Sequence, residues 1–139
     1  MTGRWVRRLV IERNGTWVLV TGRLPKVWAL YRFTCERALR YRRGFSKVLY
    51  LGEAGGYVAS PIFQEERLEL ERFRDRLGDF PRLNKTGGHK GGNLQDRISS
   101  YERGGGNTSR RVRQELQACA RQGHRVFLEW RAVRKKVST

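Results

Sequence analysis

Apolar and polar residues alternate along the first part of the chain as they do in strands. Residues 8–20 contain two short runs rich in β-branched and aromatic residues, separated by Asn14-Gly15. Because this dipeptide favours a tight two-residue turn, the runs predict a β-hairpin. Two further apolar runs, 27–33 and 47–52, are rich in strand formers and are expected to pair antiparallel. Alternation returns at 124–133 and predicts a last strand.

Other stretches have residues that typically begin or end helices. Ser60-Pro61 has the cap-then-proline order of a helix start, so the heavily charged stretch 62–77 is expected to be a surface helix. Thr108 or Ser109 is expected to cap a later helix that runs to residue 122. Gly123 then suits the left-handed position that follows a helix.

The helix that begins at Asn93 carries the most informative pattern. Asn93 can cap it, and Asp96 lies where the helix dipole favours an acid. Spacings of three and four place four side chains on one face, namely Leu94, Arg97, Ile98 and Tyr101. A guanidinium on the buried face of a short helix needs an anionic partner. A fixed cation beside a phenol therefore suits a phosphodiester and its attacking water.

Charge narrows the class of partner. The 139 residues include 30 lysines and arginines against 13 acids, which leaves a net charge of +17. A balance of this kind points to a polyanion, and first of all to nucleic acid. The expected partner is DNA, with RNA as the second candidate. A structural RNA-binding protein is a weaker alternative, because it rests on charge alone. The length is that of one domain.

Several basic side chains are candidates for nucleic-acid contacts. The basic connection 37–43 is either a solvated edge or a surface that tracks phosphates. The glycine-rich stretch 84–92 is expected to be a flexible loop rather than a nest of N–H groups. Arginines near the start of the last helix are unfavourable there unless they meet an anion. The candidate contacts are Arg40, Arg42, Arg43, Lys90, Arg110, Arg111 and Arg113.

The cysteines and the hydropathy bear on the compartment. Cys35 and Cys119 lie far apart, without a CxxC motif or a matching pair of histidines, so we expect both to be reduced and structural. No run of apolar residues is long enough to span a bilayer, and no signal peptide is seen. The expectation is a cytoplasmic protein with no membrane partner.

Three short segments together resemble a known family. They are Ala29-Leu30-Tyr31, Tyr50-Leu51-Gly52 and the stretch from Asn93 to Tyr101. In this order they resemble the GIY-YIG nucleases, and the last segment is similar to the version in the bacterial excision-repair nuclease. The first segment has alanine where the family name has glycine.

The resemblance implies a fold and an activity. It implies an α+β domain over residues 1–139, with a small antiparallel or mixed sheet of three strands flanked by helices. The core would be 25–133, interrupted by a helical insertion at 54–92 and preceded by the hairpin extension 1–24. The implied activity is hydrolysis of nucleic-acid phosphodiesters with one divalent ion, Mg²⁺ or Mn²⁺.

The resemblance also implies roles for individual residues. Tyr31 and Tyr50 would orient or deprotonate the water, Arg97 would stabilise the phosphorane charge, and Tyr101 would replace the family's His or Tyr. A deprotonating role requires that the pKa of a tyrosine, ordinarily near 10, be lowered. The alternative for Tyr31 and Tyr50 is that they are core aromatics of two strands.

A metal-binding carboxylate is harder to place. The family's glutamate lies on a helix after the third strand, and only a few residues follow position 133 here. Glu53 at a strand end and Glu129 on the last strand are the candidates, although alternation puts Glu129 opposite the apolar face of its strand. Glu115 on the preceding helix is a further substitute, and His89 is a candidate base or ligand.

Two functions follow from these patterns. The first is a metal-dependent endonuclease acting on DNA, structure-selective or non-specific because the chain has no base-reading motif. The second is a catalytically inactive module, or a subunit of a nucleoprotein assembly, that uses Arg97 only to hold phosphate. The four aromatic and basic side chains favour the first, and the absent glutamate favours the second. A single site makes one nick, so a double-strand cut requires a homodimer or two successive events.

Overall fold

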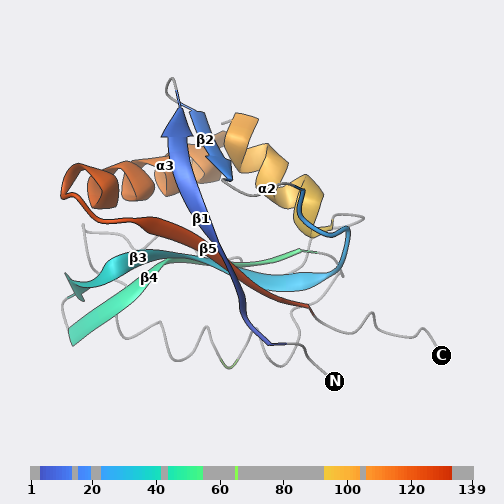
Figure 1. Cartoon of the computed structure of the whole chain (residues 1–139), viewed down its shortest axis with the longest axis horizontal. Coiled ribbons are helices and arrows are strands. Elements are labelled where there is room, and N and C mark those ends of the chain that lie inside the picture. Colours follow the sequence, from blue (N-terminus) through green and yellow to red (C-terminus); the bar gives the residue numbers. More distant parts are fainter. Residues whose placement is uncertain are drawn as a thin grey trace.

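The strands form a single antiparallel sheet. The computed structural model describes residues 4–13, 16–19, 23–41, 44–54, 65, 93–103 and 106–132. The strands are β1 (Val6–Arg13), β2 (Thr16–Leu19), β3 (Ala29–Tyr41), β4 (Gly44–Ala54) and β5 (Val126–Ala132). Their order in the sheet is β2-β1-β5-β3-β4, and every pair is antiparallel. Two helices, α2 (Leu94–Arg103) and α3 (Gly106–Arg121), lie on one side of it (Figure 1).

The N-terminal hairpin is an integral part of this sheet. β1 pairs with β2 as predicted, and β1 also pairs with β5 through residues such as Val6 and Trp130. The predicted antiparallel pairing of β3 with β4 is likewise present. The α+β class is therefore confirmed. The sheet has five strands, because the predicted hairpin joins the three implied strands through the pairing of β1 with β5.

β3 and β4 are longer than the sequence pattern indicated. The stretch 37–43 was expected to be a connection, but β3 continues to Tyr41 and β4 begins at Gly44. The register is irregular on the way, because it passes from Thr34↔Val48 to Leu39↔Ser46. The prediction was wrong because charge was taken as a loop signal. Long charged side chains are also compatible with a two-stranded ribbon that is open to water.

Asn93 caps α2 as predicted. Its Oδ1 accepts a hydrogen bond from the N–H of Asp96 at 3.0 Å. The first turn is also tied to the chain before β3, because the N–H of Leu94 donates to the carbonyl of Val27 at 2.8 Å. The N–H of Leu24 donates to the side chain of Gln95 at 2.8 Å. These bonds fix the helix that carries Arg97 against the start of β3.

The second helix begins earlier and ends where predicted. α3 starts at Gly106 instead of at the expected caps, Thr108 or Ser109. Its end has the hydrogen bonds of a Schellman motif, because His124 N–H donates to the Cys119 carbonyl and Gly123 N–H to the Ala120 carbonyl. Gly123 has a φ of 82°, which is favourable for glycine alone.

Several predicted elements lie outside the residues that the structure describes. The predicted helix 62–77 lies outside the described residues except for Glu65, which is helical. The glycine-rich stretch 84–92, with His89 and Lys90, also lies outside them, as does most of the hairpin turn. No described helix is long and apolar enough to cross a membrane.

The core lies between the helices and the sheet. Side chains from α2 and α3 that are fully or almost fully buried form one cluster with residues of the strands. The helical members are Leu94, Ile98, Tyr101, Val112, Leu116 and Cys119. The predicted inward face of α2 is therefore the face that packs, with Arg97 as its basic member.

A disulfide crosses this core. Cys35 of β3 is bonded to Cys119 of α3, and each side chain is only 1% exposed. The expectation of two reduced cysteines was wrong, because their separation of 84 residues conceals a contact that only the packing of α3 on β3 creates. The cytoplasmic expectation loses the support that it drew from reduced thiols, since disulfides are typical of oxidising compartments.

We expect the disulfide to contribute strongly to stability. A cross-link that closes 84 residues restricts the unfolded chain, and replacing both cysteines with serine should lower the unfolding free energy by about 4 kcal/mol. Denaturant titrations with and without reductant measure the loss. Reductant should not affect the doubly substituted variant. Equal stability of the oxidised and reduced wild-type chains would contradict the expectation.

Candidate active site

Strand alternation places two tyrosines on the face that carries the helices. Tyr31 pairs with Gly52 and Phe33 pairs with Tyr50 across β3 and β4. Because side chains at alternate positions share a face, these four positions all face the same way. Tyr31 is 1% exposed and Tyr50 is 3% exposed. Both tyrosines therefore enter the core from neighbouring strands.

The third tyrosine comes from α2. The hydroxyl oxygens of Tyr31 and Tyr101 lie 2.7 Å apart and share a hydrogen bond. The Tyr101 ring lies 6.0 Å from that of Tyr31 and 6.0 Å from that of Tyr50, both edge to face. The rings of Tyr31 and Tyr50 are 6.3 Å apart. We call these three residues the tyrosine cluster.

Gly52 makes room for this arrangement. A Cβ atom at position 52 would lie 2.5 Å from both the Cζ and the hydroxyl oxygen of Tyr31. The Tyr31 ring therefore lies directly across the backbone of its partner strand. Any side chain at position 52 would push Tyr31 away from Tyr101.

Arg97 completes the group. It lies one helical turn before Tyr101 on α2, is half-buried, and interacts with the hydroxyl of Tyr31 through a hydrogen bond. Its Nε atom is buried and has no hydrogen-bond partner. Partial burial alone would lower the pKa of Arg97, but the oxygens of Tyr31 and Tyr101 outweigh this and raise it. The guanidinium is a cation whose buried Nε donor has no partner.

Burial keeps the cluster neutral. Desolvation raises the pKa of Tyr31 and of Tyr50 above the ordinary value. The pKa of Tyr101 is raised well above its ordinary value, first by desolvation and then by the nearby Tyr31 and Tyr50, which also oppose its ionisation. A neutral phenol can donate a hydrogen bond or orient a water molecule. It is a poor base near neutral pH.

The two candidate carboxylates do not join the cluster. Glu53 follows Gly52 on β4 and pairs with Leu30, so it lies on the opposite face of the sheet. Glu129 pairs with Arg32 and Arg7 across β3 and β1, which places it on that opposite face as well. Glu115 is buried on α3. The described residues include no group of three or more potential metal ligands.

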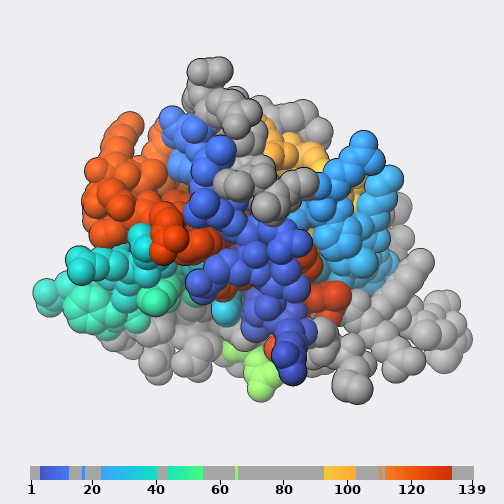
Figure 2. Space-filling model, viewed as in Figure 1, coloured from blue at the N-terminus to red at the C-terminus, as the bar shows by residue number. Residues whose placement is uncertain are grey.

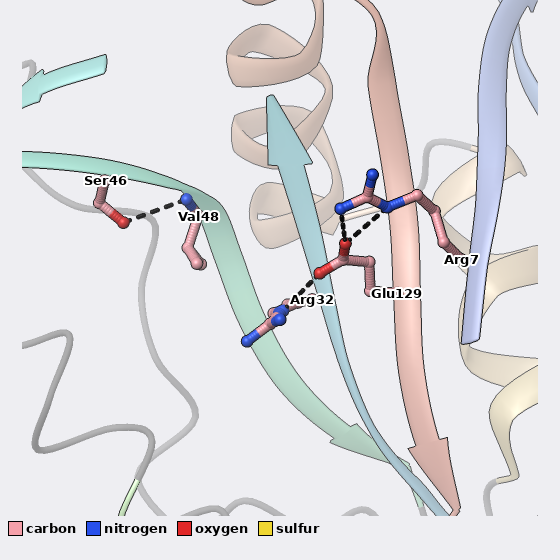
Figure 3. Close-up of polar contacts among 5 residues, drawn as sticks. All are labelled: Arg7, Arg32, Ser46, Val48 and Glu129. Atoms are coloured by element: carbon pink, nitrogen blue, oxygen red, sulfur yellow. Dashed lines mark hydrogen bonds and ion pairs between the residues drawn. The ribbon is translucent and has the colours of Figure 1, made fainter. Parts of the chain in front are cut away.

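Glu129 has a structural environment of its own. Arg7 Nη2 lies 2.6 Å from its Oε2, and Arg32 Nε lies 2.7 Å from its Oε1 (Figure 3). Burial alone would raise the pKa of Glu129, but hydrogen bonds from Arg32 and Arg7 outweigh it and lower this pKa. Arg32 also covers the ring of Trp5 at 3.8 Å. The carboxylate is thus saturated by arginines, which makes it unsuitable as a metal ligand.

The predicted nucleic-acid contacts are dispersed. Arg40 is exposed on β3 and Arg110 is exposed on α3, whereas Arg113 is half-buried. Because α3 begins at Gly106, these two α3 arginines lie beyond its first turn, and the predicted conflict with the dipole does not arise. Arg42, Arg43 and Lys90, and the side chain of Arg111, lie outside the described residues.

Sequence reasoning missed one member of the site. The ring of Phe33 packs edge to face against Tyr101 with centroids 5.5 Å apart. Phe33 is 2% exposed and lies two residues after Tyr31 on the same face of β3. The strand period of two would have identified it, because a residue at i+2 shares the face of residue i.

Comparisons with known proteins add no relative: no family model, no curated protein and no solved structure matches the chain.

Gly52→Ala tests the close approach of Tyr31. Because the added methyl meets the Tyr31 ring, we expect the unfolding free energy to fall by about 1–3 kcal/mol. The cost should be much smaller in a Tyr31→Ala background, where the ring is absent. Denaturant unfolding of the four members of this cycle measures the coupling. Additive effects would show that the two residues do not touch.

Alkaline titration tests the burial of the cluster. Above about pH 10 the unfolded chain releases tyrosine protons that the folded chain retains, so stability should fall as pH rises. The loss should approach about 1.4 kcal/mol per pH unit for each buried tyrosine. Melting temperatures at stepped pH measure it, and Tyr50→Phe should reduce the slope. Ionisation of every tyrosine near its ordinary pKa would contradict the burial.

Proposed function

We propose that this protein is an endonuclease that hydrolyses phosphodiester bonds in nucleic acid. DNA is the first candidate substrate and RNA is the second. One observation carries the proposal. The buried Nε of Arg97 has no partner, and it lies within a group of three hydroxyl-bearing side chains that contact one another. A buried donor without a partner is costly, so a site of this kind suits an anionic ligand. The resemblance to the GIY-YIG nucleases supports the same assignment.

The chemistry of the site suits a phosphodiester. Arg97 would bind a non-bridging oxygen and stabilise the charge that develops as water attacks phosphorus. Tyr31 would orient the guanidinium through its hydrogen bond, and the neutral phenols would orient the attacking water. Because the pKa values of all three tyrosines are raised, we assign none of them as the general base.

A divalent cation, Mg²⁺ or Mn²⁺, belongs to the proposal through the resemblance alone. Glu53 and Glu129 lie on the far face of the sheet, and Glu129 is saturated by two arginines. The described residues therefore do not fit a metal beside the tyrosine cluster, and we assign no step of the reaction to one.

A second function has an observation in its favour. The same far-face position of both glutamates suits a module that holds nucleic acid through Arg97 without cutting it. Such a protein could act as a subunit of a nucleoprotein assembly. Both functions predict binding of nucleic acid, but only the first predicts cleavage.

Cleavage assays separate the two functions. End-labelled branched, single-stranded and duplex DNA would be incubated with Mg²⁺, with Mn²⁺ and with a chelator. Under the proposal, cleavage falls by at least about 10²-fold in Arg97→Ala, because a stabilising donor is lost, and the chelator shows whether cleavage depends on a cation. Tyr31→Phe should also slow cleavage while preserving the fold, since it removes one hydroxyl.

Arg121→Ala is the matched control. Arg121 is an exposed arginine at the end of α3, so its removal changes the net charge equally without altering the site. Its cleavage rate should equal that of the wild type. Binding without cleavage under every condition would overturn the enzymatic proposal and leave the binding module.

A further inference from the structure

The ends of β3 and β4 extend past the rest of the sheet. The last β3–β5 pair is Cys35↔Val126, followed by one backbone bond from Glu36 N–H to the Arg125 carbonyl at 2.8 Å. Beyond it, among the described residues, the two strands pair only with each other. We call residues 37–41 and 44–47 the arm. It forms the left-hand tip of the view in Figure 2, in teal.

The root of the arm is tied to the start of β5 by hydrogen bonds. Arg125 donates from Nε and Nη2 to Oε2 of Glu36 at 2.9 and 2.7 Å, and its N–H donates to Oε1 at 3.0 Å. Where the ladder is irregular, the Ser46 hydroxyl accepts from the Val48 N–H at 3.1 Å (Figure 3). Leu39 is 9% exposed and belongs to the core. The arm is thus a preorganised projection.

The exposed side chains of the arm form a distinctive set. Phe45 is 64% exposed and is the one exposed large hydrophobic residue in the described part of the chain. Arg40 is its direct partner across the ladder, and Lys47 lies two residues along β4 on the same face. Both cations are exposed. An aromatic ring is therefore flanked by two positive charges.

This set fits a particular ligand. We propose that the arm binds unpaired nucleotides, with Phe45 as a stacking platform for a base and with Arg40 and Lys47 as contacts to the neighbouring phosphates. Aromatic stacking with flanking cations is the general chemistry of single-strand binding. A net charge of +17 favours a polyanion over an acidic or apolar protein surface. In a continuous duplex the faces of the bases are already stacked on neighbouring base pairs, so they cannot stack on the ring of Phe45.

The inference rests on the proposed function, because it assigns a substrate preference to the same nuclease. Phe45 is five residues before Tyr50 on β4, so their Cα atoms lie at most about 17 Å apart. The inference is therefore that a strand bound at the arm continues toward the position of Tyr50 on the same β-strand. A substrate with an unpaired segment beside the cut bond should be preferred to a continuous duplex.

Equilibrium binding tests the arm separately from cleavage. Fluorescence anisotropy would be measured in the presence of a chelator, with a labelled single-stranded oligonucleotide and a duplex of the same length. Phe45→Ala should weaken binding of the single strand about tenfold, because one stacked base is lost. Binding of the duplex should change little. Phe45→Tyr retains a ring and should restore binding of the single strand.

Charge variants test the phosphate contacts. Arg40→Ala and Lys47→Ala should each weaken binding of the single strand and reduce the slope of log affinity against log salt by about one. Arg121→Ala removes an exposed cation outside the arm and should leave both quantities unchanged.

Three results would overturn the inference. Phe45→Ala could leave binding of the single strand intact, or it could weaken single strand and duplex equally. It could also lower the molar mass in sedimentation while binding is unchanged, in which case Phe45 lies at an interface between copies of the chain. If the arm behaves as expected but no DNA is cut, the nuclease proposal fails and the arm stands as part of a binding module.

Discussion

The need to satisfy buried hydroxyl groups organises this site. Three tyrosines enter one core from β3, β4 and α2, and an unpaired hydroxyl in such a place costs on the order of 1–3 kcal/mol. The hydroxyls of Tyr31 and Tyr101 bond to each other at 2.7 Å, and Tyr50 and Arg97 join the same network. Tyr31 can reach its position only because residue 52 has no side chain. The hydroxyl groups are hydrogen-bonded within this network, whereas the buried Nε of Arg97 has no partner.

The sheet separates Arg97 from Glu129. On the helix face Arg97 has phenols and no acid among the neighbours that determine its pKa. On the other face Glu129 is held between Arg7 and Arg32. Because strand alternation keeps Glu129 away from Arg97, this acid cannot pair with the cation, and no described acid is among the groups that shift the pKa of Arg97 most. A cation without an internal acidic partner is the feature on which the proposed phosphate site rests.

Periodicity and capping were enough to predict much of this structure. The cap at Asn93, the inward face of its helix and the pairing of β3 with β4 follow from local spacing. The disulfide could not be predicted, because it depends on tertiary packing across 84 residues. The length of the arm was not predicted, because the high arginine content of residues 37–43 was interpreted as that of a loop. The isolation of Glu129 from the site, by contrast, was already contained in strand alternation.

The most direct test of the central claim is to observe the Arg97 Nε–H group itself. Nitrogen–proton correlation spectra that resolve arginine side chains would be recorded while a dinucleotide phosphodiester is added, with Arg97→Lys identifying the signal. If the unpaired donor is a phosphate site, this resonance should move downfield and its exchange with water should slow as the ligand binds. A dinucleotide that shifts only the signals of exposed arginines, and leaves this resonance unchanged, would contradict the account.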